Sequence, residues 1–137
     1  MNFTQLLFYP VSLIYSLVIK IRNIFFDKGI FKAGKVKCKV ISVGNISVGG
    51  SGKTPTVVYL TKLLQSIGKK TAVLSRGYRR KSKGYLYVSD GSQVFETAET
   101  AGDEIVLVAE ECNTIAAVCG NRFEGAKKII KNDDPDV

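Results

Sequence analysis

The chain has 137 residues, enough for one domain with a buried core, and 45% hydrophobic and 23% charged residues give it a globular composition. With 20 Lys and Arg against 12 Asp and Glu, the net charge of +8 suggests an anionic partner. The absence of histidine excludes a histidine-based general acid, catalytic triad or metal site within the chain. The cysteines Cys38, Cys112 and Cys119 lie in apolar runs without CxxC spacing, as expected for small buried residues of a reduced, cytosolic protein.

The first expected element is an apolar helix within residues 1–19, which carry no charged side chain. A secretory signal would need a basic start and a small-residue cleavage site, and both are missing. A spanning helix would need a more continuous apolar stretch. Between Lys20 and Lys39, seven basic residues accompany one acidic residue, Asp27. This pattern favours a helix lying in the membrane interface beside an anionic leaflet, and the alternative is a soluble helix packed on the domain core.

From residue 37 onward, predicted strands and helices alternate. Strands are expected at 37–43, 71–75 and 114–118, and helices at 54–67, 101–112 and, capped by Asn121, up to about Lys131. The turn signal Asp90-Gly91 predicts a hairpin of residues 85–88 and 93–95, and Val137 is expected to begin a further strand. The sequence therefore predicts an α/β fold: a parallel sheet with helices on both faces and a small β-hairpin insertion.

The segment Val43 to Pro55 predicts a nucleotide phosphate site. Its sequence, Val-Gly-Asn-Ile-Ser-Val-Gly-Gly-Ser-Gly-Lys-Thr-Pro, is typical of a strand end, a glycine-rich loop and a helix start. Backbone N–H groups and the positive helix end would face the phosphates, Lys53 would reach the β- and γ-phosphates, and Thr54 would ligate Mg²⁺. The strict P-loop pattern has glycine where Ser47 stands, and the alternative is an ordinary glycine-rich turn. The residues expected to bind the nucleotide are Ser47, Val48, Gly49, Gly50, Ser51, Gly52, Lys53 and Thr54.

Two further features could contribute chemistry. Asp103 stands at a predicted helix start, where the helix dipole keeps a carboxylate ionised and able to accept a proton from a substrate hydroxyl. Judged from the residues alone, a first-turn aspartate that merely suits the helix end is the favoured interpretation. The basic loop from Arg76 to Lys83 could clamp phosphate groups or bind nucleic acid, although such loops are more often simply solvated.

Three motifs resemble the tetraacyldisaccharide 4'-kinase family in order and spacing. They are the segment from Val43 to Pro55 with its non-glycine at Ser47, Leu-Ser-Arg-Gly-Tyr at 74–78, and Ala-Gly-Asp-Glu at 101–104. The resemblance extends over essentially the whole chain. It implies a P-loop kinase on the cytoplasmic face of the bacterial inner membrane. Such a kinase uses ATP and Mg²⁺ to phosphorylate the 4'-hydroxyl of a tetraacylated glucosamine disaccharide 1-phosphate, a lipid substrate, giving lipid IVA.

The same resemblance implies residue roles and an incomplete domain. It assigns Asp103 as catalytic base, Lys53 to the phosphates and Arg76 to the active site, and Arg79 stands where many members have glycine. Members are longer and continue past the counterpart of Val137 with a strand bearing paired aspartates and a histidine. We therefore expect residues 1–36 to serve membrane association and 37–137 to be the N-terminal, ATP-binding part of a kinase domain, inactive alone.

The alternative function is a nucleotide-binding, membrane-associated switch or adaptor without kinase activity. A GTPase would need a guanine-reading Asn-Lys-x-Asp element, which the sequence lacks. Nucleic-acid binding would need aromatic residues interleaved with the basic loop, and only Tyr78 and Tyr85 flank it. We therefore expect a membrane surface and a lipid substrate as partners, and no nucleic acid.

Overall fold

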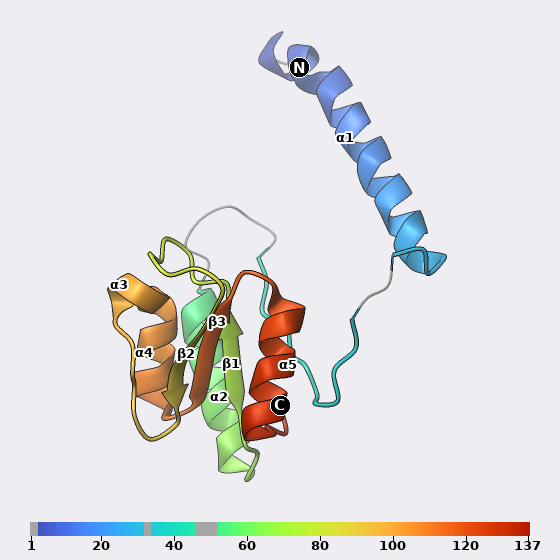
Figure 1. Ribbon diagram of the computed structural model, residues 1–137. Helices are drawn as coiled ribbons and strands as arrows, with labels where there is room; N and C mark the ends of the chain where they lie inside the picture. The colour runs from blue at the N-terminus through green and yellow to red at the C-terminus, as the bar shows by residue number, and fades with distance from the viewer. Residues whose placement is uncertain (1–2, 32–33, 46–51) are drawn as a thin grey trace. The chain divides into compact units, whose positions relative to one another are not determined.

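A computed structural model describes residues 3–31, 34–45 and 52–137, and the chain divides into two units, Met1–Lys35 and Val36–Val137. The first unit consists of helix α1 (Phe3–Asp27) and a short turn (Figure 1). Gly29, with φ of 68°, reverses the chain so that the Phe31 ring meets the rings of Phe25 and Phe26 edge-on, each at 5.4 Å. Among the helices in the described part of the chain, none is long and apolar enough to cross a membrane.

The second unit is built on a three-stranded sheet in the order β1-β3-β2 (Figure 1). The strands are β1 (Ala72–Ser75), β2 (Tyr85–Asp90) and β3 (Ile115–Cys119). Strand β3 pairs in parallel with β1 and antiparallel with β2, so the expectation of a purely parallel sheet is wrong. The reason lies in the connection after β1, because the loop 76–84 contains no crossover helix and returns the chain in the opposite direction.

The predicted hairpin is present, but its first strand is a full member of the sheet. Beyond β2 the pairing is limited to a single bridge between Ser89 and Val94, supported by the Phe95 N–H donating to the Val88 carbonyl at 2.8 Å. The predicted turn residue Gly91 has a φ of 93°, and the side chain of Asp90 accepts from the N–H groups of Ser92 and Gln93. The turn chemistry at Asp90-Gly91 is therefore as expected.

Residues 37–43, expected to form the first strand, have no strand assignment in the structure. In this segment, the Lys39 N–H donates a hydrogen bond to the Asp136 carbonyl at 3.2 Å. An apolar sequence adopts a strand only where a neighbouring strand pairs with it along its length. Here the neighbouring segment, Asp136–Val137, contacts only the beginning of residues 37–43. These residues therefore lack the continuous partner that a strand needs.

In the described part of the second unit, four helices complete the fold: α2 (Lys53–Ser66), α3 (Ala98–Ala101), α4 (Asp103–Cys112) and α5 (Arg122–Asp133). The helix expected at 101–112 is divided, because Gly102 has a φ of 100° and breaks the helical path between α3 and α4. The expected glycine end of α2 is confirmed: Gly68, with φ of 75°, donates to the Gln65 carbonyl, and Lys69 donates to Leu64.

Helices cover both faces of the sheet, as the alternating pattern predicted. Ala116 and Val118 of β3 pack against α4, together with Ile105 and Ala109. Ile115 and Ala117 of β3 face the other way. There they meet α5, whose buried core residue is Ile129.

The α5 face also carries a polar tie between the sheet and the helix. The Tyr87 hydroxyl donates to the Asp133 carboxylate at 2.8 Å, joining β2 to the end of α5. Burial, and then this hydrogen bond, raise the pKa of Tyr87 above its ordinary value. The hydroxyl therefore remains a donor across the neutral pH range.

Candidate functional site

The described part of the predicted phosphate site begins helix α2. Ser47, Val48, Gly49, Gly50 and Ser51 lie outside the described residues. Gly52 precedes the helix with φ of 72° in the left-handed region, and the Lys53-Thr54 pair forms the start of the first turn. A methyl group added to Gly52 would meet no atom of the described residues within 4 Å, its two chain neighbours aside.

Among the described residues, no side chain caps the first turn of α2, whose N-cap is Gly52. The Thr56 hydroxyl and N–H both contact the Gly52 carbonyl, at 2.8 and 3.1 Å, which fixes the turn without covering its N–H groups. Uncapped N–H groups at a helix start, together with the positive end of the helix dipole, suit an anion. This geometry fits the phosphate groups of a nucleotide.

Asp103 opens helix α4 and is exposed. Its Oδ1 accepts from the Glu104 N–H at 2.9 Å, which holds the carboxylate at the helix start. Like α2, this helix follows a glycine, Gly102, and has no side-chain cap.

Helices α2 and α4 lie side by side and bring their first turns to one level. Lys62 and Glu111 form an ion pair at 3.4 Å, and the Gln65 amide donates to the Cys112 carbonyl at 2.9 Å. Both helices rise by about 1.5 Å per residue, so equal steps back along each reach equal heights. The same number of residues back from Lys62 and Glu111 leads to Thr54 and Asp103. The Lys-Thr pair and the candidate base therefore start neighbouring helices at the same end of the sheet (Figure 1).

A second pair of predicted motifs is in direct contact. A methyl group added to Gly77 would lie 3.1 Å from the Ala101 carbonyl oxygen, and one added to Gly102 would lie 3.4 Å from that of Tyr78. The Arg-Gly-Tyr loop thus rests on the junction of α3 and α4, and both glycines have positive φ. Between the two motifs lies a cavity of about 360 Å³ whose lining includes Asp103.

Arg76 follows the end of β1 and is exposed, and it does not line that cavity. Arg79 has φ of 59°, the left-handed conformation that favours glycine, and its guanidinium lies 5.2 Å from the Tyr78 ring centroid. Glycine adopts this conformation more readily than arginine does.

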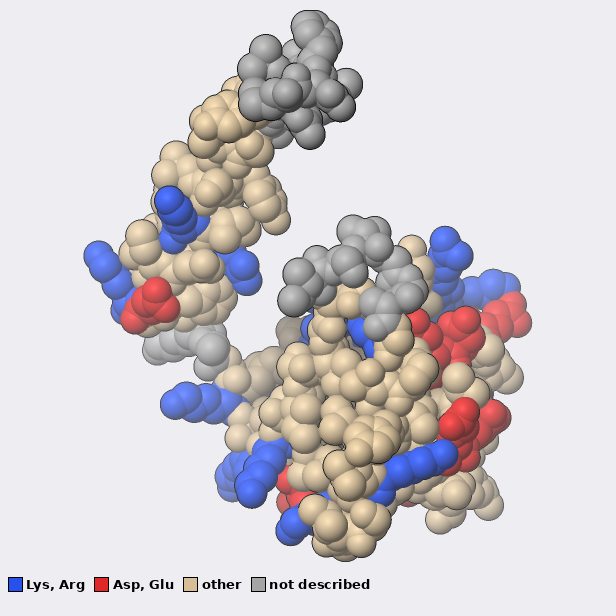
Figure 2. Space-filling model, turned by 180° about the vertical axis from the view of Figure 1, so that it is seen from behind, with Lys and Arg blue, Asp and Glu red and all other residues tan. Residues whose placement is uncertain are grey.

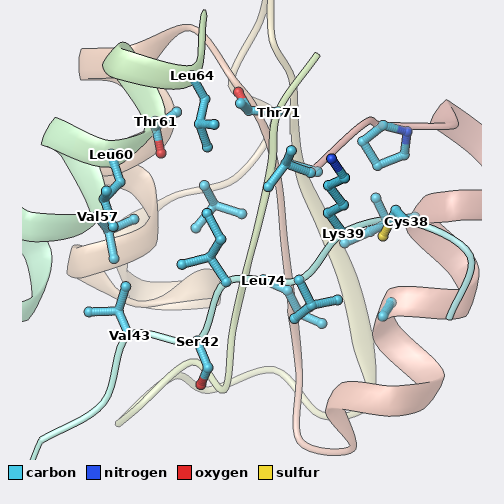
Figure 3. Close-up of a pocket in the computed structure, with 18 of the residues that line it drawn as sticks. Cys38, Lys39, Ser42, Val43, Val57, Leu60, Thr61, Leu64, Thr71 and Leu74 are labelled. Carbon is cyan, nitrogen blue, oxygen red and sulfur yellow. The ribbon is translucent and has the colours of Figure 1, made fainter. Parts of the chain in front are cut away.

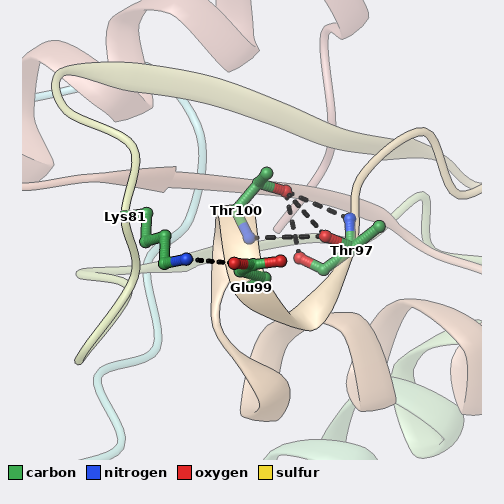
Figure 4. Close-up of polar contacts among 4 residues, drawn as sticks. All are labelled: Lys81, Thr97, Glu99 and Thr100. Atoms are coloured by element: carbon green, nitrogen blue, oxygen red, sulfur yellow. Dashed lines mark hydrogen bonds and ion pairs between the residues drawn. The ribbon is translucent and has the colours of Figure 1, made fainter.

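Residues 80–82 of the basic loop make specific contacts that sequence reasoning missed, although Lys81 is exposed. Lys81 forms an ion pair with Glu99 (Figure 4). The backbone N–H of Lys81 also donates to the Glu99 carbonyl at 3.1 Å. The Ser82 hydroxyl donates to the Thr100 carbonyl at 2.6 Å. The guanidinium of Arg80 donates to the Val118 and Gly84 carbonyls. These contacts fix the loop against α3 and the end of β3.

One signal in the sequence could have indicated α3. Thr97 and Thr100 form a reciprocal capping box, in which the Thr97 side chain accepts from the Thr100 N–H and the Thr100 side chain from the Thr97 N–H (Figure 4). A hydroxyl residue followed three positions later by a second side-chain acceptor is a helix-start pattern. It lies just before the helix that was expected to begin at Ala101.

The fold and the site together define a class: an α/β protein whose uncapped helix starts hold a Lys-Thr pair and an aspartate at one end of the sheet. The family model described as LpxK, tetraacyldisaccharide-1-P 4'-kinase, matches residues 4–137. The chain belongs to this family.

Individual relatives agree with the family match. The tetraacyldisaccharide 4'-kinase of Aquifex aeolicus (strain VF5) is 43% identical over 129 residues, which cover 93% of this chain and 40% of the relative. That of Chlorobium chlorochromatii (strain CaD3) is 41% identical over 131 residues, covering 95% and 35%. A crystal structure of the "apo" form of LpxK from Aquifex aeolicus in complex with ATP aligns with a TM-score of 0.85 at 41% identity, covering 98% of this chain and 42% of that one. The chain thus spans about two fifths of the length of these relatives.

Proposed function

We propose that the chain is the ATP-binding part of a kinase that transfers the γ-phosphate of ATP to the 4'-hydroxyl of a tetraacyldisaccharide 1-phosphate. The observation that carries this proposal is the common level of two uncapped helix starts, one with Lys53 and Thr54 and the other with Asp103. The family match, the names of the relatives and the ATP in the solved relative support the same activity.

Each residue has a defined task in this proposal. The open first turn of α2 binds phosphate oxygens through its N–H groups, and the Lys53 ammonium neutralises charge on the β- and γ-phosphates. Asp103 accepts the proton of the substrate hydroxyl as the new phosphate ester bond forms and the bond from the γ-phosphorus to the oxygen bridging the β-phosphate breaks, releasing ADP. Arg76, exposed beyond β1, adds positive charge near the phosphates.

Magnesium fits this site as a partner of the nucleotide. The described residues contain no cluster of three or more His, Cys, Asp or Glu side chains that could hold a metal ion. The Thr54 hydroxyl, next to Lys53 at the start of α2, is the ligand that we expect the chain to offer, with phosphate oxygens and water as the others. When bound, Mg²⁺ would supply neutralisation of the phosphate charge.

A product assay tests the proposal. The full-length kinase, incubated with ATP, Mg²⁺ and tetraacyldisaccharide 1-phosphate, should yield the 4'-phosphorylated lipid by mass spectrometry. ATP hydrolysis without lipid product would favour the nucleotide-dependent switch instead. We expect the 137-residue chain alone to give no product, because phosphoryl transfer needs metal ligands, a positioned nucleophile and charge stabilisation together. Robust turnover by the isolated chain would contradict this assignment of roles.

We further propose that α1 lies on the cytoplasmic face of the bacterial inner membrane. The helix exposes large apolar side chains, with Leu13, Ile14 and Tyr15 more than half exposed. Basic side chains gather toward the C-terminal part of the helix, as Figure 2 shows. Apolar area and adjacent positive charge are the two contributions that hold an interfacial helix on an anionic membrane.

Vesicle sedimentation separates those two contributions. Deletion of residues 1–26 should abolish binding to anionic vesicles. Substitution of Lys20 and Arg22 by glutamine should weaken the salt-sensitive part of binding, because two of the basic side chains are lost and salt screens charge. Substitution of Leu13 and Ile14 by glutamine should remove the salt-resistant part. Unchanged binding after the deletion would show that α1 is not the membrane contact.

A further inference from the structure

Two cavities in the described part of the second unit differ in their lining. One, of about 290 Å³, is lined mainly by aliphatic side chains, and in Figure 3 the α2 side chains point across it toward Leu74 of β1 and the 38–43 segment. The other, of about 360 Å³, lies between the loop after β1 and the start of α4. Its lining includes Arg79, Asp103 and Glu104, so side chains of both charges share one space. We call this second space the charged cavity.

Arg79 occupies the second central position of a tight turn. The Arg80 N–H donates to the Gly77 carbonyl at 3.4 Å, and Tyr78 and Arg79 lie between these two residues. Arg79 has φ of 59°, whereas Tyr78 does not have a positive φ. This is the pattern of a type II turn, whose second central position normally takes glycine or asparagine. The arginine is therefore held in an unfavourable backbone conformation.

The other described non-glycine residues with positive φ have an evident structural reason for it. Asn113 and Asp134, with φ of 46° and 45°, are the C-caps of α4 and α5. Asparagine and aspartate tolerate the left-handed conformation, which is common where helices end. Arg79 neither ends a helix nor belongs to these residue types. Backbone strain at such a position indicates a functional demand on the side chain.

The fold itself does not use the charge of Arg79. Its neighbour Arg80 donates to two backbone carbonyls, and Lys81 pairs with Glu99. Arg79 is exposed, and among the described residues its one side-chain interaction is with the Tyr78 ring, whose centroid lies 5.2 Å from the guanidinium carbon. The guanidinium thus keeps all its N–H donors for a ligand.

We propose that Arg79 binds the phosphoryl group during its transfer in the charged cavity, an inference that rests on the proposed function. A general base lies within hydrogen-bond reach of the hydroxyl that it deprotonates, so the γ-phosphate comes to the cavity that Asp103 lines. Arg76 and Lys83 are also exposed cations of the loop, but they do not line this cavity. A guanidinium can donate two parallel hydrogen bonds to phosphate oxygens, and contact with the Tyr78 ring orients its plane.

Arg79 contributes most while the phosphoryl group is between its two oxygen partners. As the bond to the β-bridging oxygen breaks and the bond to the substrate oxygen forms, negative charge is spread over the three equatorial oxygens. N–H donors that meet these oxygens stabilise the transition state. The positive charge also offsets the repulsion between the phosphoryl group and the carboxylates of Asp103 and Glu104 in the same cavity. The effect of Arg79 is therefore expected in kcat.

The variant Arg79→Gly separates this role from a structural one. Glycine adopts a positive φ without strain, so Tm should stay the same or rise. In the full-length kinase kcat should fall about 10-fold to 100-fold, the range for a hydrogen bond to a charged group, while the KM for the lipid changes little. Arg79→Lys keeps the charge and should retain part of the rate. Asn113→Gly, the matched control, relieves the positive φ at the end of α4 and should leave kcat unchanged.

Three results of these kinetics would overturn the proposal. They are an unchanged kcat in Arg79→Gly, a fall in kcat that comes with a lower Tm, and a rise confined to the KM for the lipid, which would place Arg79 at the 1-phosphate of the substrate.

A second measurement needs no turnover. Isothermal titration with ADP, Mg²⁺ and aluminium fluoride, a mimic of the transferred phosphoryl group, should show binding weakened by about tenfold or more in Arg79→Gly, with the Kd for ADP alone unchanged. Equal Kd values for the mimic in the two proteins would also overturn the proposal. Wild-type turnover tests the kinase and the mimic tests Arg79, so the two proposals can fail separately.

Discussion

The helices of the second unit begin in two different ways. Helix α5 is closed by Asn121, whose side chain accepts from the N–H groups of Phe123 and Glu124 at 3.1 and 3.3 Å. Helix α3 is closed by the capping box of Thr97 and Thr100. Helices α2 and α4 instead follow glycines with positive φ and have no side-chain cap.

The presence or absence of a side-chain cap correlates with whether the helix start carries candidate site residues. A side-chain cap stabilises a helix by about 1 kcal/mol, because it satisfies N–H groups that have no partner inside the helix. The two helices that lack a cap are those whose first turns carry Lys53, Thr54 and Asp103. A side chain at the N-cap position closes α3 and α5. In the proposed site a glycine at that position offers none, and at α4 Asp103 itself accepts from the Glu104 N–H.

The largest expected effect concerns the start of α4. In the full-length kinase, Asp103→Ala should lower kcat by roughly 100-fold to 10,000-fold, the usual contribution of a general base. The KM for ATP should change much less, because the carboxylate acts on the reacting hydroxyl. Steady-state kinetics measure both. Glu110→Ala, an exposed carboxylate on the same helix, is the control and should leave kcat unchanged. Equal losses in the two variants would mean that Asp103 is only a helix-start residue.

The next effect concerns the start of α2. Lys53→Ala should weaken ATP binding by about 10-fold to 100-fold, since a hydrogen bond to a charged group contributes about 1.5–3 kcal/mol. Isothermal titration of the full-length protein measures the loss. Lys62→Ala removes a lysine from the exposed ion pair further along the same helix and should leave the Kd unchanged. An unaltered Kd for Lys53→Ala would show that the phosphate site is wrongly assigned.

A smaller effect is expected at a capped helix. Asn121→Ala should lower the free energy of unfolding by about 1 kcal/mol, because two N–H groups of α5 lose their acceptor. ATP affinity should not change. Chemical denaturation and a nucleotide titration of the same variant separate the two outcomes. Asn121→Asp keeps an acceptor and should retain most of the stability. A loss of ATP affinity with unchanged stability would place Asn121 in the binding site and break the contrast between the helix starts.

The smallest effect is expected at the anchored basic loop. Lys81→Ala removes an ion pair with Glu99 in which both side chains are mostly exposed, at 76% and 65%. Exposed pairs contribute about 0–1 kcal/mol, so thermal unfolding should shift only slightly. Ser82→Ala removes the half-buried hydrogen bond to the Thr100 carbonyl and should cost somewhat more. A large drop in ATP affinity for Lys81→Ala would show that this lysine binds phosphate rather than Glu99.

Local signals in the sequence were sufficient for features that depend on neighbouring residues. The cap at Asn121, the glycine end of α2 at Gly68 and the turn at Asp90-Gly91 are all present in the structure. Each depends on hydrogen bonds within a few positions, so the residue type and spacing determine it. Asp103 was likewise expected at a helix start, and it opens α4.

Contacts between distant segments were decided by the tertiary structure. Nothing local indicates that Gly77 and Gly102 touch, or that Lys81 pairs with Glu99. The direction of β2 depends on how the chain returns after β1, and residues 37–43 need a neighbour along their length to become a strand. An apolar run specifies that a segment can pair, but the partner is set by the path of the whole chain, because strand hydrogen bonds join residues far apart in sequence.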